Sequence, residues 1–176
     1  MMRRIPRSEF RTAPWKNGGG VTHEIARLDA GPALVWRISL AEVGRDGPFS
    51  SFPGLMRVLT VIDGAGLDLE GPTQILHALP LEPVRFSGDT PIHGRLRDGP
   101  CRDVNVIFDA GKVAVEVMVL HPDAIGTATA VLALSGEVRV GEVVLAPGDY
   151  AWTEREAVQT GAGGRALLID LSPVGQ

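Results

Sequence analysis

The chain has 176 residues, a formal net charge of −4 and a hydrophobic fraction of 44%. This composition is typical of one folded domain or two fused halves, and it excludes a disordered chain. The net negative charge argues against a nucleic-acid binder, which normally carries a basic face. No apolar run approaches the ~20 residues that a membrane helix needs. The single cysteine, Cys101, fits a reducing cytoplasm, and no segment reads as a signal peptide. We therefore expect a cytoplasmic protein without nucleic-acid or membrane partners.

The first distinctive segment is residues 14–25, which read Pro-Trp-Lys-Asn-Gly-Gly-Gly-Val-Thr-His-Glu-Ile. Three consecutive glycines are costly to order, so they indicate a tight turn, a positive φ or a close approach of the backbone. One interpretation is a polar loop in which Lys16 and Asn17 help to hold an anion. The other is a plain turn into a strand, for which Asn-Gly is a strong signal, and these residues alone favour the turn.

Strand patterns dominate the rest of the first half of the chain. Residues 8–13 could form a single helical turn at most. In residues 34–40, Trp36 lies on one face and Arg37 and Ser39 on the other, as expected for a strand. Residues 56–62 form a strand between two turns, and residues 66–69 can pair back on it as a hairpin. Further strands are expected at residues 74–81, 82–86 and 103–108.

The second half repeats the pattern of short strands separated by Gly and Pro. Strands are expected at residues 113–120, 131–134, 138–140, 142–145 and 166–171. Short strands at regular spacing favour an all-β sandwich or barrel. We expect two β-rich halves, residues 1–110 and 111–176, packed as one compact unit. The strand edges of such a protein invite pairing, which allows a homodimer.

Two arginines on predicted strands are candidate ligand-binding residues. Arg57 shares a face with Leu59 and Val61, and a buried guanidinium needs an anionic or carbonyl partner. The partner is either a ligand carboxylate held in a bidentate clamp or an internal Asp or Glu, unless Arg57 is exposed at the strand end. Arg37 has the same interpretations.

A further polar face lies on the strand at residues 103–108. The period of two places Asp103 and Asn105 together, where they could orient a cation such as Arg57 or bind an amide or hydroxyl ligand. The alternative is a polar, solvated face of an edge strand. Two aromatic residues, Phe49 and Phe52, either form walls of a small pocket or plug the barrel.

Three groups of residues resemble the HutD/Ves family. They are residues 14–25, residues 36–57, and the short runs Phe86-Ser-Gly-Asp, Asp98-Gly-Pro and Asp103-Val-Asn. The resemblance spans about residues 5–108 and is highly specific, and Gly148-Asp149 extends it more loosely. It implies a cupin-like double β-sandwich or barrel, a bicupin. It also implies a small-ligand-binding or regulatory role in histidine utilisation, with no catalytic activity firmly attached.

Metal binding and catalysis find little support in the sequence. The usual cupin metal site needs a His-x-His pair, and none of His23, His77, His93 and His121 are two residues apart. Gly18–Gly20 lacks the Lys-Ser/Thr of a P-loop, and no Gly-x-Ser-x-Gly elbow is present. We therefore expect no metal ligand, no cofactor and no catalytic residue.

These observations lead to a functional hypothesis, a metal-free bicupin that binds a small carboxylate metabolite and moderates histidine utilisation. The ligand suggested by that role is N-formylglutamate. The expected ligand-binding residues are Lys16, Asn17, Trp36, Arg37, Ser39, Phe52, Arg57, Asp103 and Asn105. One alternative is a metal-independent isomerase, epimerase or hydrolase, for which the plausible acids and bases are His23, Glu24, Asp46 and Asp103. Another is a protein-partner module with a vestigial ligand site.

Overall fold

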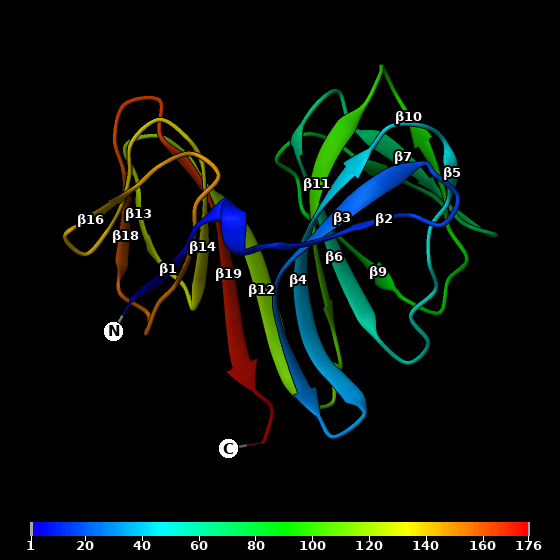
Figure 1. Cartoon of the computed structure of the whole chain (residues 1–176), viewed down its shortest axis with the longest axis horizontal. Coiled ribbons are helices and arrows are strands. Elements are labelled where there is room, and N and C mark those ends of the chain that lie inside the picture. The colour runs from blue at the N-terminus through cyan, green and yellow to red at the C-terminus, as the bar shows by residue number, and fades with distance from the viewer. Residues whose placement is uncertain (1, 176) are drawn as a thin grey trace. The chain divides into compact units, whose positions relative to one another are not determined.

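The computed structural model describes residues 2–175, and nearly all of its regular structure is β-strand. The chain divides into two compact units. One is Arg11–Lys112, here called the N-terminal unit, and the other is Met1–Phe10 with Val113–Gln176, here called the C-terminal unit. Each unit contains two antiparallel sheets (Figure 1). The all-β fold expected from the strand patterns is confirmed.

The N-terminal unit pairs a large sheet with a small one. The six-stranded sheet has the order β2 (Arg11–Pro14), β3 (Gly20–Ala30), β4 (Ala33–Val43), β11 (Cys101–Phe108), β6 (Met56–Asp63) and β9 (Val84–Ser87). The four-stranded sheet has the order β5 (Gly47–Pro48), β10 (His93–Leu96), β7 (Leu67–Glu70) and β8 (Ile75–Ala78). Apolar side chains between these sheets, among them Leu59, Val61 and Leu67, form the core of the unit.

The C-terminal unit is built in the same way. Its five-stranded sheet has the order β1 (Arg3–Ile5), β17 (Tyr150–Trp152), β14 (Ala130–Ser135), β19 (Arg165–Pro173) and β12 (Val113–Leu120). Its four-stranded sheet has the order β13 (Ile125–Thr127), β18 (Ala157–Thr160), β15 (Val138–Val140) and β16 (Val143–Leu145). The first residues belong to this unit because β1 pairs with β17. A 3₁₀ turn, η1 (Arg7–Glu9), comes after β1.

Two local expectations are corrected. Residues 66–69 do not form a hairpin with the preceding strand, because β7 pairs with β8 and β10 in the opposite sheet. The glycines Gly64 and Gly66, at φ of 93° and 99°, let the chain cross between the sheets. The single helical turn allowed over residues 8–13 has other bounds: a 3₁₀ turn spans Arg7–Glu9, and Arg11 begins strand β2, which pairs with β3.

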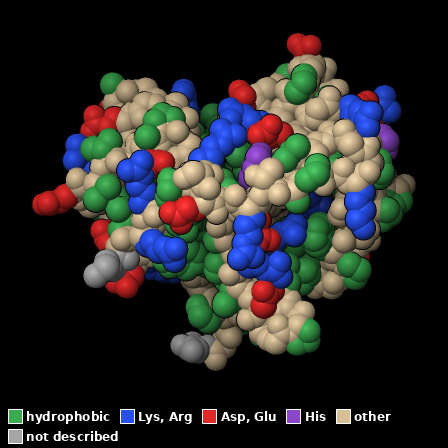
Figure 2. Space-filling view, in the orientation of Figure 1, with side chains coloured by type: hydrophobic (Ala, Val, Ile, Leu, Met, Phe, Trp, Pro, Cys, Tyr) green, Lys and Arg blue, Asp and Glu red, His purple; other side chains and the backbone are tan. Residues whose placement is uncertain are grey.

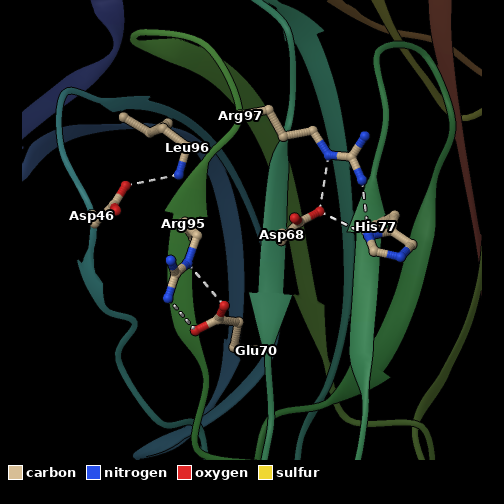
Figure 3. A network of polar contacts seen from close by, with 7 residues as sticks. All are labelled: Asp46, Asp68, Glu70, His77, Arg95, Leu96 and Arg97. Carbon is tan, nitrogen blue, oxygen red and sulfur yellow. Dashed lines mark hydrogen bonds and ion pairs between the residues drawn. The ribbon is translucent and has the colours of Figure 1, made fainter.

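The four-stranded sheet of the N-terminal unit carries a charged network on its solvent face (Figure 3). Asp68 Oδ1 lies 2.9 Å from Arg97 Nε and 2.8 Å from His77 Nδ1. Arg95 Nε lies 2.9 Å from Glu70 Oε1, with the Arg95 side chain 59% exposed. Exposed pairs of this kind contribute about 0–1 kcal/mol each. The network therefore lies on the solvent-facing side of the sheet. The polar residues of the candidate site lie on the inner side of the N-terminal unit.

Candidate functional site

Register within the six-stranded sheet gathers polar side chains at its centre. On β11, Ile107 is opposite both Arg37 of β4 and Arg57 of β6. Two residues earlier, Asn105 is opposite Ser39 of β4. Because side chains alternate along a strand, all of these residues project from the same face. Residues far apart in sequence thus meet on the inner face of the sheet.

A cavity of about 850 Å³ opens over this face. Its volume lies within the ~300–1,000 Å³ range of small-molecule sites. The charged side chains that line it comprise one carboxylate, Glu24, and five cations, which are Arg11, Lys16, Arg27, Arg37 and Arg57. Figure 2 shows Lys and Arg side chains gathered on the face in view, with Asp and Glu between them. The cavity itself carries an excess of positive charge, so it favours an anion.

Arg57 forms the floor of the cavity and is only 5% exposed. Its Nη2 donates a hydrogen bond of 2.8 Å to Asn105 Oδ1, and its Nη1 donates one of 3.1 Å to the Ser50 carbonyl oxygen. Burial lowers the pKa of Arg57 to about 10, partly opposed by Asp103, so the guanidinium stays charged at neutral pH. Its carbon atom Cζ lies 5.0–5.7 Å from three ring centroids, those of Phe49, Phe52 and Phe86.

Arg37 lies beside Arg57, and both stack on the ring of Phe52, with Arg37 Cζ 5.1 Å from the ring centroid. Burial is also the main cause that lowers the pKa of Arg37, and the charge of Glu24 opposes this shift. The Nε groups of both arginines are buried without a hydrogen-bond partner within residues 2–175. No carboxylate of that part of the chain lies in ion-pair contact with either guanidinium. The two cations therefore line the cavity without an ion-paired carboxylate from the described residues.

Asp103 lies behind this arginine pair. It is fully buried and accepts a short hydrogen bond from Asn105 Nδ2, while its Oδ2 has no partner within residues 2–175. Desolvation raises the pKa of Asp103 to about 7, and the charge of Arg57 and the amide of Asn105 work against this rise. The two hydrogen-bond partners of the Asn105 amide fix its orientation, with the oxygen toward Arg57 and the nitrogen toward Asp103.

The glycine segment forms the loop between β2 and β3 at the mouth of the cavity. Gly18 adopts φ +68° and donates a backbone hydrogen bond to Trp15, which closes a tight turn. Asn17 Oδ1 accepts a hydrogen bond of 2.8 Å from the Gly19 N–H. The turn expected from Asn-Gly is therefore present. The same turn places Lys16 and Asn17 in the cavity lining, where an anion-holding role remains a hypothesis.

Seven of the nine expected site residues line the cavity. They are Lys16, Asn17, Arg37, Ser39, Phe52, Arg57 and Asn105. Trp36 does not, because strand alternation directs it to the face of β4 opposite Arg37, and the expectation that it forms a wall of the same pocket is corrected. Asp103 does not reach the cavity either, because it lies behind Asn105.

Sequence reasoning missed two cations of the lining, Arg11 and Arg27. Arg11 was hidden because its segment did not read as a strand, although in β2 it lies opposite Glu24. Arg27 comes after an irregularity in the pairing of β3 between Glu24 and Ala26, which changes the face on which later residues lie. No local signal in the sequence marks that irregularity.

The four acids and bases considered for catalysis are separated. Only Glu24 lines the cavity. His23 lies 2.8 Å from Thr12 Oγ1 and 2.9 Å from Glu42 Oε1, and Asp46 accepts a hydrogen bond from the backbone of Leu96 (Figure 3). Within residues 2–175, no three His, Cys, Asp or Glu side chains converge as a metal site. Over the same residues, no helix has the length and hydropathy of a membrane span.

Comparison with known proteins places these features in a family context. The sequence model of the HutD family matches residues 7–169. A 21.2 kDa protein from the hutC 3' region of Pseudomonas putida is 41% identical over 106 residues, covering 57% of this chain and 54% of that protein. Protein Ves of Citrobacter koseri is 34% identical over 108 residues, covering 60% and 56% of the two chains. The chain thus spans about half the length of these curated relatives.

A solved structure extends the likeness to the whole chain. The structure of HutD from Pseudomonas fluorescens SBW25, in a formate condition, is 34% identical and has a TM-score of 0.85. The match covers 99% of this chain and 100% of that one. The cupin-like double β-sandwich expected from the sequence is thereby confirmed.

Proposed function

Because the chain belongs to the HutD family, we propose that it binds a small carboxylate metabolite in the cavity of its N-terminal unit. The bound state of this cytoplasmic protein then moderates histidine utilisation. Membership of the family connects the chain to that pathway, and the hutC-region relative supports the same connection. The ligand and the regulatory role are the parts that the proposal adds.

One observation carries the proposal. Two partly or fully buried guanidinium groups, Arg37 and Arg57, line one cavity without an ion-paired carboxylate within residues 2–175. A buried cation without an anion is costly, and a bidentate carboxylate supplies both the charge and the acceptors.

The best candidate ligand is N-formylglutamate. Its two carboxylates match a lining in which cations outnumber the carboxylate Glu24. Its formyl amide can bind polar side chains such as Asn17 and Ser39, and its carbon chain can pack on Phe52 and Ile107. Asn105 is less suited to contact the amide, because its own amide already bonds Arg57 and Asp103.

Titration calorimetry tests the proposal. We expect wild-type protein to bind N-formyl-L-glutamate, and Arg57→Ala to weaken binding at least about 30-fold, because a truncated buried charge contact costs roughly 2–5 kcal/mol. Thermal unfolding provides a second readout. At about 100 times the dissociation constant, a ligand stabilises by about 2.7 kcal/mol, which raises the melting temperature of a chain of this size by roughly 5–10 °C.

A matched control separates the cavity from general charge. Arg95→Ala also removes an arginine of the N-terminal unit, but on the solvent face of the small sheet (Figure 3). We expect this variant to bind as the wild type does. A neutral ligand, the diamide of N-formylglutamate, should not bind. Equal binding of the diamide, or no binding of any small carboxylate at millimolar concentration, would contradict the proposal.

A further inference from the structure

A chain of three side chains runs from the cavity into the interior of the N-terminal unit. Arg57 lines the cavity, Asn105 accepts its Nη2 hydrogen bond at 2.8 Å, and Asp103 accepts the hydrogen bond of Asn105 Nδ2. Arg57 and Asn105 are each 5% exposed, and Asp103 is 0% exposed. A charge at the buried end is thus connected through one amide to the cation that faces the ligand.

The surroundings of Asp103 are apolar. Its partners across the sheet are Ala41 on β4 and Val61 on β6. The opposite sheet supplies Leu67 and Leu69, which are fully buried in the same core. An ionised carboxylate is disfavoured in such a place unless it is paired, yet Asp103 Oδ2 has no hydrogen-bond partner within residues 2–175.

Given the proposed carboxylate binding, we infer that Asp103 is a positioning residue that acts through Asn105 on Arg57, and that anion binding in the cavity is coupled to proton uptake at Asp103. When Asp103 is ionised, it offsets part of the charge of Arg57 and repels an anion. When it is neutral, the full charge of Arg57 is available to the ligand. The anion and the proton therefore favour each other's binding.

Among the charged and titratable groups near these three side chains, Asp103 is the group whose protonation changes near neutral pH. Arg57, from β6, is the charged group that acts on Asp103, and it stays protonated because its pKa, although lowered, is about 10. Arg37, from β4, acts on Arg57 and is also cationic. Cys101, from β11, is a neutral thiol because burial, with the charge of Asp103, raises its pKa to about 12. Glu24, from β3, acts on Arg37.

The direction of the pH effect is set by this arrangement. With a pKa of Asp103 near 7, raising the pH from 5.5 to 8.5 ionises Asp103 and weakens anion binding. A unit charge a few ångströms behind Arg57, at a protein-like dielectric, changes affinity by about tenfold. Wild-type affinity for N-formyl-L-glutamate should fall by that factor across the range, and at pH 7 binding should take up roughly 0.4 proton.

Calorimetry in two buffers of different ionisation enthalpy measures this uptake directly, in the unmodified protein. Asp103→Asn keeps an acceptor for Asn105 and removes the charge. We expect this variant to take up no proton, to match wild-type affinity at pH 5.5 and to bind about tenfold more tightly than wild type at pH 8.5. Asp103→Ser is a second charge-free variant if the first does not fold. Asp46→Asn removes an exposed carboxylate from the same unit and should leave the uptake unchanged.

The outcomes separate this inference from the proposed function. A wild-type protein that binds the ligand without proton uptake overturns the inference alone. So does an Asp103→Asn variant with wild-type pH dependence, or with weaker binding at every pH, which would indicate a purely structural role. A wild-type protein that binds no carboxylate overturns both proposals.

Discussion

The two units share one construction, two antiparallel sheets around a core, but they differ in what the core contains. In the C-terminal unit the core cluster is aliphatic, and buried hydroxyls such as Thr160 bond to backbone carbonyls, here that of His121 at 2.6 Å. In the N-terminal unit, Arg57, Asn105 and Asp103 bond in a chain beneath a cavity. Under the proposed function, the same scaffold serves packing in one unit and ligand binding in the other.

The stability of the protein should be more sensitive to loss of side-chain volume in the aliphatic core of the C-terminal unit than in the polar core of the N-terminal unit. Leu168 is 1% exposed within the C-terminal cluster. We expect Leu168→Ala to lower the free energy of unfolding by about 2–5 kcal/mol, because it leaves a cavity in a packed core. Chemical denaturation measures the loss. Ligand affinity measured well below the melting temperature should not change, and a large loss of affinity would break the division of roles between the units.

The polar core should be dispensable for stability but not for binding. The double variant Arg57→Met with Asp103→Asn removes both buried charges. We expect unfolding free energy at pH 7.5 to equal that of wild type or exceed it by about 1–4 kcal/mol, because replacing buried charges with apolar groups is often neutral or stabilising. Ligand binding should be lost. A double variant several kcal/mol less stable than wild type would show that this network holds the fold together.

The single variant Arg57→Met sharpens the same comparison. It leaves Asp103 without the cation that partly compensates its burial, so it should be less stable than the double variant at pH 7.5. The gap should narrow at pH 5.5 and close only below the pKa of an unfolded aspartate, about 3.9. Arg57 lowers the pKa of Asp103, so its removal raises that pKa further, and the stability that a raised folded-state pKa contributes is lost as the pH rises from the unfolded value toward the folded one. Unfolding curves at the two pH values measure the gap.

Displacing an aromatic ring that lines the cavity should have a smaller effect on ligand affinity and stability. Gly94 of β10 packs so closely that a Cβ atom there would lie 2.5 Å from Phe49 Cε1. Phe49 lines the cavity, and its ring centroid lies 5.7 Å from Arg57 Cζ. Gly94→Ala should displace the ring, reduce ligand affinity by about threefold to tenfold and cost roughly 1 kcal/mol in stability. Unchanged affinity would remove Phe49 from the account of the site.

The outer face of the same sheet should give the smallest effect. Arg95→Ala breaks an exposed pair with Glu70, and such pairs contribute about 0–1 kcal/mol. We expect a melting temperature within a few degrees of wild type and unchanged affinity. High salt should mimic the substitution, because it screens exposed charges. An affinity change in this variant would extend the functional surface beyond the cavity.

Much of the fold and part of the site could be predicted from strand periodicity. Alternation placed Arg57 with Leu59 and Val61, and all three are buried as expected. It also placed Asp103 and Asn105 on one face, where they bond each other. These inferences succeeded because a period of two depends only on local backbone geometry.

The pairing between strands could not be predicted in the same way. The contact of Arg57 with Asn105 depends on the register of β6 and β11, which are separated by more than 35 residues. The same limit explains Arg27, whose facing depends on an irregularity in the pairing of β3. Trp36 is a different case, because alternation alone places it on the face of β4 opposite Arg37, so strand periodicity was sufficient to exclude it from the pocket.

The most direct test of the central claim is to observe the arginines themselves. Nitrogen-15 spectra of arginine side chains resolve Nε–H groups, and conservative Arg37→Lys and Arg57→Lys variants assign them. On addition of N-formyl-L-glutamate, we predict that the Nε–H signals of Arg37 and Arg57 shift, because a carboxylate bound to the two guanidinium groups changes the charge and hydrogen bonding around them. Binding that leaves both signals unchanged would contradict the account.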